Sequence, residues 1–142
     1  MYEKLFEPID VGPVTIPNRI VRSAHSTALP LKRLIAYHEA RAVGGVGMST
    51  LEATGVHLSS PAMRSIIPLH DDAVIPFYKE LSDALRPHGM KILQQIYHPG
   101  SARAPGKGTF QISASAIPNP IAGGIPTAMT IPMIEEMIEA FA

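Results

Sequence analysis

The sequence contains no cysteine, and neither sign of charge is in excess. Without cysteine this span holds no disulfide bond and no thiolate metal site, which is typical of a reducing compartment, so we expect a cytoplasmic protein. Twelve basic residues balance twelve acidic ones, and the chain therefore lacks the long-range field that draws proteins to nucleic acid or anionic lipid. We expect no nucleic acid partner.

Long apolar runs are also missing. No segment approaches the roughly 18 apolar residues that a membrane-spanning helix needs. The first residues, Met1 to Glu7, already carry charge and lack the basic and then apolar pattern of a signal peptide. We therefore expect no membrane partner and no cleaved leader. The content of 46% hydrophobic and 17% charged residues is that of a globular protein.

The sequence does contain alternating strand and helix patterns. They predict, in order, a β-hairpin (residues 5–16), a strand (19–24), a helix (31–43), a strand (46–51), a helix (71–87), a strand (91–97), a long loop (99–129) and a helix from Thr130 onward. Right-handed parallel crossovers produce this order. It predicts an α/β fold with about three β/α units preceded by a hairpin.

The length limits how this fold is completed. A closed (β/α)8 barrel needs about 250 residues, whereas the chain has 142. We interpret residues 1–142 as the N-terminal portion of such a barrel, truncated before the fourth strand. An open sheet of three parallel strands exposes apolar faces and edges, so residues 1–142 alone are predicted not to form a stable monomer. We expect the remainder of the barrel in the same or another chain, and an oligomer.

Three segments resemble one known family. They are Leu5–Arg19 (LFEPIDVGPVTIPNR), Thr50–His57 (TLEATGVH) and Gln94–Gly100 (QQIYHPG). Together they resemble the old yellow enzyme or NADH:flavin oxidoreductase family, nearest to its 2,4-dienoyl-CoA reductase and trimethylamine dehydrogenase branch. The resemblance implies a TIM barrel that binds FMN, takes hydride from NAD(P)H and acts on a small-molecule substrate.

The resemblance also implies which residues bind the cofactor. In parallel β/α barrels the active site lies at the C-terminal ends of the strands. At these ends Ala24, His25 and Ser26 would line the flavin, Ala53 would let the ring approach, and Gln95 would hydrogen-bond the pyrimidine edge. A buried glutamine on a strand can instead be a satisfied core amide, but the pattern that Gln95 forms with His98 and Gly100 favours flavin.

Two histidines have alternative interpretations. His25 resembles the amine-dehydrogenase branch, which can attach flavin through a cysteine at the next position; here Ser26 cannot form that thioether, so we expect FMN to be held noncovalently. His98 either faces substrate or orders the following loop through Pro99 and Gly100. No metal-ligand spacing connects the six histidines, so we expect no metal site.

We expect an enzyme that transfers hydride from NAD(P)H through FMN to an activated alkene, such as an enoyl or dienoyl compound. One alternative is an amine or other small-substrate dehydrogenase of the same branch, whose iron–sulfur cluster would lie beyond residue 142. The other is a non-catalytic partial-barrel subunit that needs a partner chain. The family's proton-handling and phosphate-binding residues follow the fourth strand, so we expect the catalytic residues beyond residue 142 as well.

Overall fold

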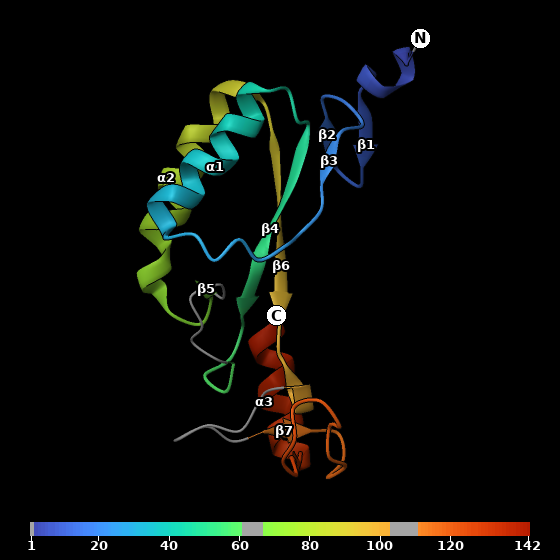
Figure 1. The fold of residues 1–142 in the computed structure, drawn as a ribbon, viewed down its shortest axis with the longest axis vertical. Coiled ribbons are helices and arrows are strands. Elements are labelled where there is room, and N and C mark those ends of the chain that lie inside the picture. Colours follow the sequence, from blue (N-terminus) through green and yellow to red (C-terminus); the bar gives the residue numbers. More distant parts are fainter. Residues whose placement is uncertain (1, 61–66, 103–110) are drawn as a thin grey trace. The chain divides into compact units, whose positions relative to one another are not determined.

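The computed structural model describes residues 2–60, 67–102 and 111–142, and Figure 1 shows the path of the chain. The chain divides into two compact units. The first comprises Met1–Ala53 and Asp72–Gln95, and the second comprises Thr54–Asp71 and Ile96–Ala142. No helix in the described ranges is both long and apolar enough to cross a membrane.

The first unit begins with the predicted hairpin. Strands β1 (Ile9–Val11) and β2 (Val14–Ile16) pair antiparallel around a turn at Gly12, whose φ of +57° lies in the left-handed region that glycine tolerates best. Strand β3 (Val21–Arg22) follows. It is shorter than the β-branched run at 19–24 predicts, because only these two residues pair with the neighbouring strand.

Two helices cover one side of the sheet in this unit. Helix α1 (Leu31–Val43) has the predicted bounds, and α2 (Ile75–Leu85) contacts it side by side (Figure 1). Their buried side chains are spaced for an inward-facing stripe; they are Leu34, Ile35, His38 and Ala42 on α1 and Phe77, Leu81 and Leu85 on α2. Helix α2 is shorter than the predicted range 71–87, because 3₁₀ turns at Asp72–Val74 and Arg86–His88 flank it.

Strand β4 (Met48–Gly55) is the centre of the main sheet. It pairs with β3, with β5 (Ile67–Pro68) and with β6 (Lys91–Tyr97). Pairing with β3 and β5 is parallel. The amide of Lys91 donates to Gly47 O, and the amide of Val56 donates to Tyr97 O. These bonds show that β4 and β6 also run in the same direction, as the sequence predicts.

The two faces of β6 differ in environment. The phenol of Tyr78 on α2 donates to Gln94 Oε1 over 2.8 Å, so Gln94 faces the helices. Successive side chains of a strand point to opposite faces, and Leu93 and Gln95 accordingly lie on the face away from α2, where both are exposed. Val21 of β3 is exposed too. Among the described residues, exposed apolar side chains therefore lie on β3 and β6, the strands that flank β4, whereas β4 itself has no exposed residue.

The second unit contains structure where a long loop is predicted between residues 99 and 129. A 3₁₀ turn at Gly100–Ala102 precedes a small parallel sheet of β7 (Ile112–Ser113) and β8 (Thr127–Ala128). The buried amide of Gln111 donates to Ser101 O and Gly123 O, at 3.2 and 3.0 Å, and holds this segment together. Residues 103–110 of the predicted loop lie outside the described residues.

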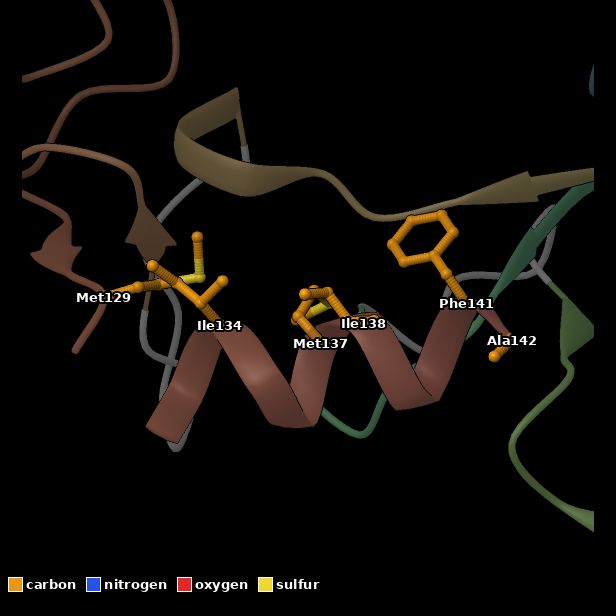
Figure 2. Close-up of a pocket in the computed structure, with 6 residues that line it drawn as sticks. All are labelled: Met129, Ile134, Met137, Ile138, Phe141 and Ala142. Atoms are coloured by element: carbon orange, nitrogen blue, oxygen red, sulfur yellow. The ribbon is translucent and has the colours of Figure 1, made fainter. Parts of the chain in front are cut away.

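Helix α3 (Ile131–Phe141) ends the second unit. Thr130 is its N-cap residue, as predicted, but its side chain makes no capping hydrogen bond. One side of the helix forms an apolar groove of about 480 Å³, lined by Met129, Ile134, Met137, Ile138, Phe141 and Ala142 (Figure 2). This apolar side of the helix is exposed in this chain, since Phe141 retains 41% of its accessible surface.

Candidate functional site

The strand ends of the first unit bring the predicted cofactor residues to one edge of the sheet. Ala24, His25 and Ser26 follow β3, Ala53 lies in β4, and Gln95 lies in β6. Because β4 pairs with both β3 and β6 and all run in the same direction, their carboxyl ends share this edge. His25, Ser26 and Gln95 are exposed, while Ala24 and Ala53 are half-buried.

A buried carboxylate lies directly behind this edge. Glu52 is 2% exposed, and its Oε1 accepts a 2.8 Å hydrogen bond from the Thr27 hydroxyl. Arg22 Nη2 lies 3.8 Å from the same oxygen. His38 Nε2, fully buried on α1, lies 3.6 Å from Oε2, too far for a hydrogen bond but close enough for electrostatic attraction. Glu52 therefore ties the residues on both sides of Ala24–Ser26 to β4.

The charge state of Glu52 follows from these neighbours. Burial by itself raises the pKa of the carboxyl, but the contacts with His38 and Thr27 outweigh it and hold the pKa below its ordinary value. The carboxylate is therefore ionised at neutral pH, which suits its position beside the Arg22 guanidinium.

The two glutamines of β6 have different roles. Gln94 Nε2 donates to Glu52 O at 2.7 Å and to Gln95 O at 3.1 Å, while its Oε1 accepts from Tyr78. Gln94 thus fixes the backbone of β6 against β4 from the helix side. Gln95 lies on the opposite face of the strand and is an exposed residue.

Tyr78 is predicted to titrate at unusually high pH. Burial of the phenol and the nearby charge of Glu52 raise its pKa to about 12. In the folded protein the phenol stays neutral above pH 10, where unfolded tyrosine ionises, so its contribution to stability is complete below pH 10 and is lost as the pH rises towards 12. A difference absorbance titration between the wild type and Tyr78→Phe, which leaves the other three of four tyrosines, is expected to show this one late ionisation. A difference signal near pH 10 would contradict the assignment.

His98 lies in the second unit at one end of a hydrogen-bonded chain of side chains. Its Nδ1 accepts from the Gly100 amide at 3.1 Å, so Nε2 carries the proton of the neutral ring and can donate to Ser59 Oγ, 2.8 Å away. Ser59 Oγ lies 2.6 Å from His57 Nδ1, and His57 Nε2 lies 3.0 Å from Glu136 Oε1 on α3. The bond to Gly100 is the geometry that the loop-ordering alternative requires.

The sequence predicts neither this series of hydrogen-bonded side chains nor the contacts of Glu52, and the reason is the same for both. The bond between Ser59 and His98 joins residues 39 positions apart, and that between His57 and Glu136 joins residues 79 positions apart. No local spacing signals such pairs. Within the described residues, no cluster of three or more histidine, aspartate or glutamate side chains could hold a metal ion.

The comparison with protein families decides the affiliation of the chain. A model of the NADH:flavin oxidoreductase / NADH oxidase family matches residues 4–142. The chain belongs to this family. The resemblance of the three sequence segments is thereby confirmed.

Individual relatives agree with the family match. An NADH oxidase from Thermoanaerobacter brockii is 34% identical over 99% of the chain, which spans 23% of that protein. An N,N-dimethylglycine/sarcosine dehydrogenase from Chromohalobacter salexigens is 36% identical over 70% of the chain and 15% of its own length. The solved 2-naphthoyl-CoA reductase complex superposes with a TM-score of 0.83 and 28% identity over 99% of the chain and 24% of its own. The chain spans less than a quarter of each, and its fold is part of the family's TIM barrel.

Proposed function

We propose that the complete protein, meaning this chain together with the rest of its barrel, is an FMN-dependent oxidoreductase that accepts hydride from NAD(P)H. Membership of the family supports the reaction class. The observation that carries the site is the position of Gln95, an exposed residue of β6, at the edge shared with His25, Ser26 and Ala53. Ligands in such barrels bind at this edge.

The residues at this edge fit a flavin. Ala24 and Ala53 have small side chains that leave room for a planar ring, Gln95 supplies an amide for the pyrimidine, and His25 and Ser26 supply further polar atoms. Since Ser26 cannot form a thioether, FMN is held noncovalently. Bound FMN supplies the hydride chemistry, and the protein supplies orientation and electrostatics. The groups that hold the FMN phosphate and protonate substrate belong to the rest of the barrel.

The open surfaces of the chain support its interpretation as part of a barrel. Val21 of β3 and Leu93 of β6 are exposed, and the groove along α3 is apolar. Burying such surface is favourable by about 25 cal/mol per Å². We propose that the remaining β/α units cover these surfaces, either in a continuation of this chain or in a companion chain. If a companion chain supplies them, this chain is a subunit that works only when paired.

The substrate that we propose first is an activated alkene of the enoyl or dienoyl type. The second candidate is a secondary or tertiary amine, which the identity with the dimethylglycine/sarcosine dehydrogenase favours. An iron–sulfur cluster would then be held outside this cysteine-free span.

Anaerobic half-reactions separate the candidates. The flavin of the complete protein is first reduced with NADH or NADPH and then mixed with 2-cyclohexenone or an enoyl-CoA ester; reoxidation without oxygen supports alkene reduction. In parallel, the oxidised protein is mixed with sarcosine or dimethylglycine, and bleaching of the flavin bands supports the amine candidate. A flavin that neither NAD(P)H nor amine reduces would contradict the oxidoreductase proposal.

Gln95→Leu is expected to weaken FMN binding about tenfold, because the flavin amide edge loses a hydrogen-bond partner. The dissociation constant is measured by fluorescence titration of the apoprotein with FMN. Lys91→Leu is a matched control at the opposite end of the same strand, and we expect it to leave the affinity almost unchanged. Equal affinities of the Gln95 variant and the wild type would rule out the proposed contact.

A further inference from the structure

Arg22 contacts the ring of His25 at the end of the first strand. Arg22 Nη2 lies 3.0 Å from His25 Nδ1. A guanidinium has only hydrogen-bond donors and no acceptor. His25 Nδ1 must therefore be the acceptor in this contact, and the neutral ring carries its proton on Nε2. The contact selects one of the two tautomers that a neutral histidine can adopt.

The Arg22 side chain is itself held from several directions. Its Nη1 donates to Thr50 O over 2.6 Å, and its guanidinium lies 5.1 Å from the centre of the Tyr37 ring. Glu52 Oε1 is 3.8 Å away, and the Arg22 side chain is only 10% exposed. The buried carboxylate balances the charge of the guanidinium. Arg22 is therefore a fixed donor, and the more exposed His25 ring is oriented by it.

We propose that Arg22 is a positioning residue that fixes His25 as an Nε2–H donor at the flavin edge of the sheet. The proposal deepens the function proposed above and rests on it. The partner of this donor is an acceptor atom, either an oxygen at the edge of the bound flavin or a carbonyl oxygen of the substrate. A donor that is oriented before binding needs no reorganisation when charge develops on its acceptor.

The rival explanation is that Arg22 only braces the backbone. It donates to Thr50 O, and its Nη2 also lies 3.4 Å from His25 O. These two contacts would stabilise the connection after β3 whatever the state of the imidazole. The experiment must therefore measure directly which nitrogen of the imidazole carries the proton. It must also show whether the effect of replacing Arg22 depends on the presence of His25.

The first measurement is a nitrogen-15 NMR spectrum of the complete protein labelled at histidine. The resonances lost in His25→Ala identify this ring among the six histidines. At neutral pH we expect a bare Nδ1 and a protonated Nε2. A protonated Nδ1 would overturn the proposal. This measurement requires no flavin, so it decides the tautomer even if the proposed function fails.

The second measurement is a double-mutant cycle of Arg22→Met and His25→Ala, read as kcat/KM with NAD(P)H and the alkene or amine that the half-reactions identify. Arg22→Met alone is expected to lower kcat/KM about tenfold, the usual effect of losing one oriented hydrogen bond. In the His25→Ala background the same change is expected to cost clearly less than it does alone, because Arg22 then has no ring to orient and only its contacts with Glu52 and Thr50 are lost. Equal losses of kcat/KM in both backgrounds would overturn the proposal and favour the rival explanation, in which Arg22 only stabilises the backbone.

Two further measurements, the reduction potential and KM, identify the acceptor of the hydrogen bond from His25 Nε2. If it belongs to the flavin, Arg22→Met shifts the reduction potential of the substrate-free protein; if it belongs to the substrate, KM rises while the potential stays unchanged. Arg19→Met is the matched control, because Arg19 is exposed and its ion pair with Glu7, at 3.8 Å, lies outside this contact network. The control is expected to alter neither quantity.

Discussion

Replacing Glu52 with alanine is expected to lower the free energy of unfolding of the complete protein by about 3 kcal/mol, the usual cost of removing one partner from a buried ion pair. The change deprives the Arg22 guanidinium of its counter-charge and the Thr27 hydroxyl of its acceptor. Both residues flank Ala24–Ser26, so the loss of stability is expected to be accompanied by weaker flavin binding. Urea denaturation followed by circular dichroism measures the first effect, and FMN titration measures the second.

The pH dependence distinguishes the charge of Glu52 from its packing. Its pKa in the folded protein lies below the ordinary value of 4.5, so its stabilisation is present above that pH and is lost as the pH falls through the lower folded value. Glu52→Gln is expected to remove this acid-dependent part of the stability curve. Glu39→Ala, an exposed change on α1, is the control and is expected to have little effect. Unchanged stability of Glu52→Ala would contradict the anchoring role.

Gly47→Ala is expected to destabilise the protein by a similar amount, about 3 kcal/mol, because the new methyl group has no space. A Cβ at this position would lie 2.5 Å from Asn18 Oδ1 and 2.7 Å from Asn18 O. Asn18 cannot easily move, since its Nδ2 donates to Gly45 O and its Oδ1 accepts from the Ile20 amide. Thermal unfolding of the variant measures the effect.

The matched control for this prediction lies three residues earlier. A Cβ at Gly44 would approach Ala40 O and Arg41 O no closer than 3.4 Å, which is ordinary contact. Gly44→Ala is therefore expected to leave the melting temperature nearly unchanged. If both variants melt like the wild type, the close approach to Asn18 is wrong. The same close approach to Asn18 explains why glycine is required in the turn before β4.

The long periodic elements and the N-terminal hairpin could be predicted from the sequence, and three of the two-residue strands could not. The bounds of α1 and β6 agree with the predicted ranges 31–43 and 91–97, because each carries a pattern long enough to recognise. Strands β5, β7 and β8 have two residues each. Such strands are defined by a partner far away in the sequence, and no periodicity marks them. This is why the prediction of a long loop between residues 99 and 129 did not include strands β7 and β8.

The candidate site was predictable in its positions but not in its supporting contacts. The parallel strand order and the family resemblance together indicate Ala24, His25, Ser26, Ala53 and Gln95, and the structure brings the ends of their strands to one edge. Nothing local in the sequence indicates that Arg22 contacts His25 or that Glu52 lies beside Arg22. The first contact depends on the path of the chain after β3, and the second depends on the pairing of β3 with β4; only the folded chain defines either.

The absorption spectrum of the natively purified complete protein tests the central claim most directly. We expect the two visible bands of oxidised flavin, stoichiometric release of FMN on denaturation because Ser26 cannot form a covalent link, and weaker retention of FMN in Gln95→Leu. A colourless protein that remains colourless after FMN is added and the excess is removed would contradict the proposal that this edge of the sheet binds flavin.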